Sequence, residues 1–549
     1  MNTKKVTAIL QKRLAAIDWK LLVFLLLFLN VKLVVKVAAV VLICFLRPGF
    51  KLGFGIKNPR LPIFYLLIIG IALFNWLISG LLTNINYSLA VITGILFWLL
   101  CIIAAHQVKS AVEKNDPEII HQTLLVFFII NAVASLAIYG SIVWETGAIN
   151  PYKYQGNFQK YFIGTGDYIK GITMDTSTTN AVINAFGVVY FLLRNKLGWA
   201  LLCMAILLLT GSNVTNLLLC TVLLYIFFFQ STKSQKSIIV VCLLFLVVFL
   251  AKISPENTSY VTDAYEKFSG KPKISKRQPA KIIPVTEKPD SILTPEEKQQ
   301  KIAILYIDSM AAALVAKNSS ATAHATTIIT AENLKKKPEI PKANIHSAPF
   351  QHKNDTTFFQ ENLMAFIKAD SVEQSVSAVK RYNMPGKIIA LLQTAAYFQL
   401  HPLKIITGAG IGMFSSKLAF RISALKIAGG YPAKYAFISN DFKNNSLALY
   451  LNYFTKGSET HSLINTPNST YTQLVGEYGL AGILAFIFFY LGFFVKQYKK
   501  LTYGIPVLLL MAGSFFLDYW FEQLSVTVLF ELLLFLNIKE NIKVQVVKS

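Results

Sequence analysis

The chain of 549 residues contains few charged residues and few cysteines. Charged residues make up 15% of it, whereas soluble globular domains average about 25%. All five cysteines lie in apolar segments, which leaves the polar segments without a disulfide framework or a thiolate metal site. The sequence also has no Walker loop, no zinc-protease motif and no Ser-His-Asp order. We therefore assign no metal and no cofactor.

Long apolar runs separated by short charged stretches dominate the sequence, and 54% of the residues are hydrophobic. A helix of roughly 20 apolar residues crosses the hydrocarbon core of a bilayer. The net charge is +25, but the basic residues gather at the ends of the apolar runs, as the positive-inside rule requires. The pattern predicts an all-α polytopic membrane protein and argues against nucleic acid as a partner.

The first apolar run, 18–46, contains Lys32 and Lys36. Burying both in one span would cost several kcal/mol, so we predict a hairpin of two short spans that meet outside the membrane at 30–36. Further runs lie at 61–80, 87–106, 122–144, 173–193, 197–211, 214–230, 237–253, 472–495, 503–521 and 524–538. Together these runs predict about twelve transmembrane helices.

The distribution of Lys and Arg between the runs predicts that both termini are cytoplasmic and that the loops 145–172 and 254–471 lie outside. Three regions follow: an N-terminal bundle of about nine spans at 1–253, a large and mostly helical outer loop at 254–471, and the last three spans with a tail at 472–549. Within the loop, a capping box at Thr294 predicts one helix and Pro385 precedes a second at 386–400.

A glycine-rich stretch, Gly-Ala-Gly-Ile-Gly-Met-Phe at 408–414, has two interpretations. It lacks the third glycine of a dinucleotide fingerprint and no βαβ unit surrounds it. It is either a tight turn that lets backbones pack closely or a loop whose amides approach a diphosphate. Lys417 and Arg421 follow, four residues apart and among apolar neighbours. On one helical face they are candidates to bind an anion, although a solvated face is the alternative.

The junction 461–479 leads into an apolar run. His461 is a candidate general base because the pKa of histidine is near neutral pH. Ser469 or Thr470 can cap the next helix, whose N-terminus would attract an anion, so Asn468 and Ser469 are candidate binding residues. Glu477 shares a helical face with Gln473 and is either a catalytic residue or a favourable charge near the helix dipole.

Two further groups have both a functional and a structural interpretation. The carboxylates Asp518, Glu522 and Glu531 lie in or next to spans, where they serve function or pair with Lys32, Lys36 or Arg421. The outer loop 145–172 alternates tyrosine and lysine, including Lys160 and Lys170. This alternation suits contacts with sugars and anions, and it suits an interfacial belt equally well.

Three motifs resemble the superfamily of O-antigen ligases and Wzy-type polysaccharide polymerases. They are Leu-Thr-Gly-Ser at 209–212, the glycine-rich stretch at 408–414 and the segment Pro-Asn-Ser-Thr-Tyr-Thr-Gln-Leu-Val-Gly-Glu-Tyr-Gly-Leu-Ala-Gly at 467–482. The resemblance covers the membrane part from about 61 onward and 385–500, and 255–384 looks like an insertion. The chain departs from the family pattern at Asn213, where an arginine is usual, and at Pro467, where a histidine is usual.

The resemblance implies a fold like that of GT-C-type, metal-independent glycosyltransferases in the bacterial inner membrane. Such an enzyme moves a glycan from undecaprenyl diphosphate to an acceptor hydroxyl, on a glycan or on lipid A core, at the periplasmic face. Arg421 and Lys417 are then expected to hold the diphosphate, with Asn468, Ser469, Lys160 and Lys170 nearby and His461 or Glu477 as base. The alternatives are a transporter or flippase for lipid-linked glycans and a non-enzymatic scaffold for envelope assembly.

Overall fold

The computed structural model describes residues 17–46, 52–54, 59–146, 168–249, 285–290, 293, 297–298, 301–305, 385–425, 428–450, 463, 466–497 and 501–548. Helices of the α, 3₁₀ and π types account for its regular structure, and these residues contain no strand. The predicted all-α class is thus confirmed for the described part of the chain. The predicted start of a helix at Thr294, the loop residue Lys160 and most of the insertion lie outside the described residues.

The N-terminal apolar runs form helices close to the predicted bounds. These are α2 (Trp19–Phe28), α3 (Leu33–Leu46), α4 (Phe64–Ile78), α5 (Ile85–Lys114), α6 (Pro117–Thr146), α7 (Ser177–Leu193), α8 (Leu197–Leu209), α9 (Asn213–Phe229) and α10 (Lys233–Val248). Side chains that accept a hydrogen bond from the first turn fix several of the starts. Asn84 caps α5, Thr176 caps α7, and Thr232 forms a capping box with Gln235 at α10.

The C-terminal part contains longer helices and several short ones. They are α15 (Gly386–Leu400), α16 (Lys404–Thr407), α17 (Lys417–Ile422), α19 (Thr470–Ala485), α20 (Gly492–Val495), α21 (Gly504–Ser514), α22 (Trp520–Gln523) and α23 (Ser525–Lys548). Shorter 3₁₀ and π turns are η4 (Gly171–Thr173), η6 (Val285–Glu287), η9 (Ala433–Tyr435), η10 (Phe442–Leu447) and η12 (Phe486–Leu491). The predicted helix over 386–400 is confirmed.

By length and composition, three helices in the described part of the chain could cross a membrane: Ile85–Lys114, Pro117–Glu145 and Thr470–Val495. Shorter apolar helices accompany them at Trp19–Phe28, Leu33–Leu46, Phe64–Ile78, Ser177–Leu193, Leu197–Leu209, Asn213–Phe229 and Gly504–Ser514. This architecture is that expected of a helical membrane protein. The count of about twelve spans stays a prediction.

The helix breaks between α2 and α3, as the predicted hairpin requires, and the place of its tip outside the membrane stays a prediction. Lys36 nevertheless points inward, and its side chain is only 3% exposed. Its ammonium donates hydrogen bonds to the carbonyl of Phe28 at 2.7 Å and to the hydroxyl of Ser525 at 3.2 Å. The hairpin therefore brings a lysine against the start of α23.

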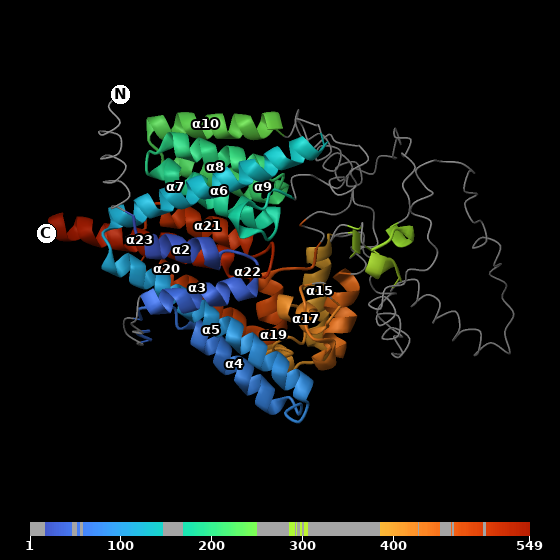
Figure 1. The fold of residues 1–549 in the computed structure, drawn as a ribbon. Helices are drawn as coiled ribbons and strands as arrows, with labels where there is room; N and C mark the ends of the chain where they lie inside the picture. Colours follow the sequence, from blue (N-terminus) through green and yellow to red (C-terminus); the bar gives the residue numbers. More distant parts are fainter. Residues whose placement is uncertain are drawn as a thin grey trace, which may run out of the picture.

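Helix α23 runs through the middle of the bundle and packs against α5, α6, α7, α21 and α22 (Figure 1). In the view of Figure 1, α6 to α10 lie above it, α4 and α5 lie below it, and α15, α17 and α19 gather at one end. Since the central helix is covered on all sides, its residues from 525 to 537 are buried, including the polar Glu531 and Asn537. The candidate site lies where α23 begins.

Candidate functional site

The glycine-rich turn packs its backbone directly on α19. The amides of Ala409 and Gly410 donate to the carbonyls of Gly476 and Glu477, at 2.8 and 3.0 Å. Gly408 has a φ of +80°, and a Cβ atom there would lie 2.3 Å from the carbonyl carbon of Glu477. Only glycine fits such a position without displacing backbone. The close-packing interpretation is confirmed, and these two amides are not free to bind a ligand.

Helix α17 starts directly after this turn and carries the two predicted cations. The hydroxyl of Ser416 caps it by accepting from the amide of Ala419 at 3.0 Å. The guanidinium of Arg421 lies 5.4 Å from the ring centroid of Phe97 on α5, and its Nε donates to the carbonyl of Ala428 at 3.4 Å. Because Lys417 and Arg421 are one helical turn apart, both face the same cavity.

This cavity opens to solvent, which is included in its empty space of about 410 Å³, and residues from distant parts of the sequence line it. The α2–α3 hairpin, α5, the segment before α7, α17 and α22 all contribute to its wall. Its lining consists of Val31, Leu33, Lys36, Phe97, Asp175, Lys417, Leu418, Arg421, Glu522 and Gln523. It therefore contains three cationic side chains and two carboxylates. We call it the charged cavity.

The charged side chains of the cavity are not paired with one another. Across the residues that the structure describes, no ion pair within 4.0 Å joins any two of Lys36, Asp175, Lys417, Arg421 and Glu522. Burial lowers the pKa of Arg421, and the charge of Glu522 acts in the opposite direction. Half-buried cations that face a cavity without a close counterion can bind an anionic ligand.

Glu522 connects three of the elements around the cavity. One carboxylate oxygen accepts from the amide of Leu418 in α17 at 2.8 Å, and the other accepts from the side-chain amide of Gln473 in α19 at 2.8 Å. From the sequence, Glu522 either serves function or pairs with Lys32, Lys36 or Arg421. The structure places Glu522, Lys36 and Arg421 around one cavity, although not in contact.

Glu477 lies behind the wall of the cavity and does not line it. Its side chain is 0% exposed, and one oxygen accepts from the hydroxyl of Ser416 at 2.6 Å and from the amide of Phe414 at 3.4 Å. It shares a face of α19 with Gln473, as predicted, and its charge interacts with that of Glu522. Its contacts hold the glycine-rich turn and the start of α17 in place.

Asn468 and Ser469 lie at the start of α19 and outside the lining of the charged cavity. Ser469 caps the helix by accepting from the amide of Tyr471 at 3.2 Å, which confirms the predicted cap. Lys387 of α15 donates to the carbonyls of Asn468 and, at 3.0 Å, of Leu517. A cation of the protein itself therefore already lies at this helix start.

The remaining predicted site residues are not brought to the cavity by the described structure. Lys170 lies before η4, with its ammonium 5.9 Å from the ring centroid of Tyr168, and it does not line the cavity. His461 and Lys160 lie outside the described residues. Conversely, Lys36 and Asp175 line the cavity but were not selected as site residues. Lys36 carried a signal, because a lysine inside an apolar run is unusual.

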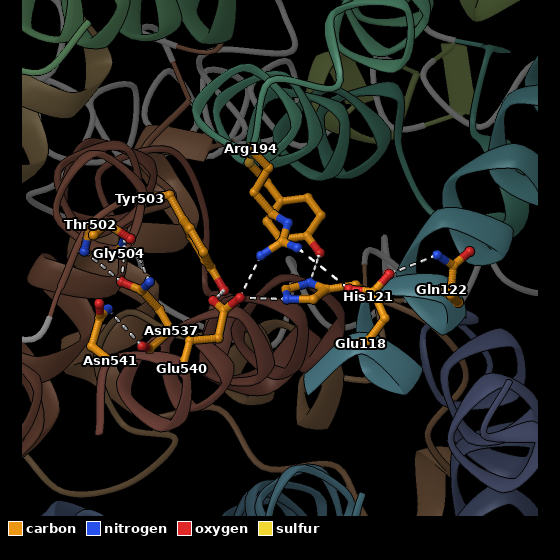
Figure 2. Close-up of polar contacts among 11 residues, drawn as sticks. Glu118, His121, Gln122, Arg194, Thr502, Tyr503, Gly504, Asn537, Glu540 and Asn541 are labelled. Carbon is orange, nitrogen blue, oxygen red and sulfur yellow. Dashed lines mark hydrogen bonds and ion pairs between the residues drawn. The ribbon is translucent and has the colours of Figure 1, made fainter. Parts of the chain in front are cut away.

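A second charged cluster lies further along α23 (Figure 2). Glu540 accepts from Nε2 of His121 at 2.5 Å, from the hydroxyl of Tyr503 at 2.9 Å and from the guanidinium of Arg194. Arg194 also approaches Glu118 at 3.9 Å. Every one of these charges has a partner of opposite sign or a hydrogen bond. We call this group the Glu540 cluster.

No protein-family model matches the chain, and no curated protein or solved structure matches it. The family resemblance seen in the sequence therefore remains a prediction.

Proposed function

We propose that the protein is a glycosyltransferase of the bacterial inner membrane, with about twelve spans and both termini in the cytoplasm. It transfers a glycan from undecaprenyl diphosphate to an acceptor hydroxyl at the periplasmic face. The observation that carries the proposal is the charged cavity, where no carboxylate among the described residues lies within 4.0 Å of the cationic groups of Lys36, Lys417 and Arg421.

The chemistry of this transfer matches the cavity. Breaking the bond between the sugar and the diphosphate leaves negative charge on the departing lipid diphosphate. Cations fixed in a partly buried site stabilise such charge more strongly than water does, because they need no reorganisation during the reaction. The linkage is already activated, so the reaction requires no nucleotide and no metal in this proposal.

An apolar surface next to the cavity supports a substrate with a lipid tail. Helix α3 places Lys36 in the cavity wall, whereas its other side exposes Val34 (80%), Val37 and Val41. A polyprenyl chain would lie along such an apolar face while its diphosphate reaches the cations. A soluble anion would gain nothing from this face.

The test uses purified protein in lipid nanodiscs with an undecaprenyl-diphosphate-linked oligosaccharide and an acceptor glycan. We expect a longer or newly linked glycan from the wild-type protein and a loss of about 100-fold in rate from Arg421→Ala. Lys434→Ala is the matched control, because Lys434 is an exposed cation of the same outer segment that does not line the cavity.

Three outcomes separate the candidate functions in this assay. Product formation that depends on Arg421 supports the transferase. Movement of the lipid-linked glycan across a bilayer without product indicates a transporter or flippase. Neither product nor movement, with correctly folded protein, indicates a scaffold, and full transfer by Arg421→Ala contradicts the proposed site.

A further inference from the structure

The charged cavity contains a carboxylate whose acceptor capacity is not exhausted. Glu522 is 8% exposed, and its two oxygens accept hydrogen bonds from the Leu418 amide and the Gln473 side chain, with the Lys417 amide also directed at it. An ionised carboxylate offers about four lone-pair sites, so these donors do not use all of them. The Leu418 and Gln473 donors come from different helices and fix the orientation of the carboxylate. Capacity to accept a further hydrogen bond therefore remains at the cavity wall.

Burial dominates the electrostatic surroundings of Glu522. It raises the pKa of Glu522 above its usual value, while the Leu418 amide and the charges of Lys417 and Arg421 act to lower it. The other groups that face it are Lys36, Asp175, Glu477 and the neutral Cys101, Tyr478 and Tyr519. A raised pKa makes a carboxylate a stronger base than a free one, and a general base works best when its pKa is near the ambient pH.

The other carboxylate in the cavity, Asp175, differs in both respects. It is only half-buried, and its Oδ2 accepts from the hydroxyl of Thr179 at 2.9 Å within the first turn of α7. Asp175 is thus less enclosed than Glu522 and already accepts from a local hydroxyl, so we assign it no part in the proton transfer.

We propose that Glu522 is the catalytic base of the transfer. This inference rests on the proposed function. Glu522 accepts the proton of the acceptor hydroxyl while the hydroxyl oxygen bonds to the anomeric carbon. The bond from that carbon to the diphosphate oxygen breaks, and its electron pair leaves with the lipid diphosphate. Glu522 then releases the proton to solvent, which restores the carboxylate.

The charges of the side chains in the cavity indicate a different role for each. Lys36, Lys417 and Arg421 bind the leaving group, and Glu522 faces the same space without an ion pair to any of them among the described residues. A base in direct contact with a cation would be a poorer proton acceptor, because an adjacent positive charge stabilises the ionised carboxylate. Glu477, behind the wall, acts as a positioning residue through Ser416 and the turn.

The experiment compares Glu522→Gln with Glu118→Gln, the same substitution at an exposed glutamate that does not line the cavity, in the nanodisc transfer assay. We expect Glu522→Gln to lower kcat about 100-fold or more with KM for the lipid-linked glycan nearly unchanged. Glu118→Gln should keep kcat within about 2-fold of the wild-type value, because it changes no group of the cavity. Because burial raises the pKa of Glu522, the wild-type rate should fall toward acid pH above the usual titration range of a glutamate, and this acid limb should be absent from Glu522→Gln.

A second variant separates lost chemistry from lost structure. In Glu522→Ala, added formate should restore part of the rate, because it supplies a carboxylate in the space left by the side chain. If the wild-type protein transfers glycan but Glu522→Gln keeps its rate within about 3-fold, the inference is wrong and the proposed function stands. If Glu522→Gln folds poorly, two other results decide. The inference is overturned when formate does not restore the rate of Glu522→Ala and the wild-type rate does not fall at acid pH. If the folded wild-type protein transfers nothing, the proposed function fails, and the inference with it.

Discussion

The charged cavity and the Glu540 cluster lie near the same helix, but their charged side chains are arranged differently. In the Glu540 cluster, His121, Arg194 and Tyr503 converge on one carboxylate (Figure 2). In the cavity, three cations and two carboxylates line one space without an ion pair between them in the described structure. Fully paired charges stabilise a fold, whereas charges kept apart around a space are available to a ligand.

The two groups are separated along α23 by most of its length. Ser525 accepts from Lys36 of the cavity, and Glu540 follows fifteen residues later in the same helix. At 1.5 Å per residue this places them roughly 22 Å apart. The separation means that each can be disturbed alone, so variants can show which one supports the fold and which one supports the activity.

Removing the carboxylate of the Glu540 cluster should have the largest effect on stability. Glu540→Gln removes the carboxylate that Arg194 and His121 share, which leaves Arg194 only the more distant Glu118, and the loss of this partly buried ion pair costs about 3 kcal/mol. We expect a lower midpoint of thermal unfolding in detergent and an unchanged glycan-transfer rate per folded molecule. A loss of transfer without a loss of stability would make this cluster functional and remove the contrast.

Removing a cation of the charged cavity should show the opposite pattern. Arg421→Ala should lower the transfer rate about 100-fold, equivalent to about 2.7 kcal/mol of transition-state stabilisation. Its unfolding midpoint should stay close to that of the wild-type protein, because Arg421 makes only one long hydrogen bond and a ring contact among the described residues. A large loss of stability in Arg421→Ala, measured by the same thermal unfolding, would show that the cavity is a structural feature.

Sequence patterns predicted the helices of this fold better than they predicted which distant residues come together in space. Apolar runs placed the helices, and the spacing of Lys417 and Arg421 placed both in one cavity, because each signal is local. Lys36, Asp175 and Glu522 meet only after α3, α7 and α22 pack together, which no local pattern encodes. His121 and Glu540 are 419 residues apart in the sequence, so their pairing was equally invisible.

A smaller change in the Glu540 cluster should have a graded effect. Tyr503→Phe removes one hydrogen bond to Glu540 and leaves its contacts with Arg194 and His121 in place. A hydrogen bond to a charged group contributes about 1.5 kcal/mol. The unfolding midpoint should therefore fall by less than that of Glu540→Gln. An equal fall would mean that the hydroxyl, and not the ion pairs, holds the cluster together.

The smallest expected effect is a change of the unfolding midpoint with pH, which should differ between variants of the two regions. Although burial opposes it, contacts with His121, Arg194 and Tyr503 lower the pKa of Glu540 below its usual value of 4.5. The unfolded chain then binds a proton more readily than the folded one, so the ionised Glu540 adds stability above about pH 4.5, and this contribution is lost as pH falls through the lowered pKa.

We expect the difference in unfolding midpoint between wild-type protein and Glu540→Gln to narrow on going from pH 7 to pH 4. The small difference between wild-type protein and Arg421→Ala should not narrow in this range, because arginine stays protonated throughout it. A constant gap for Glu540→Gln would mean that the carboxylate gains nothing from its partners, and the fully paired cluster would then have no energetic advantage over the charged cavity.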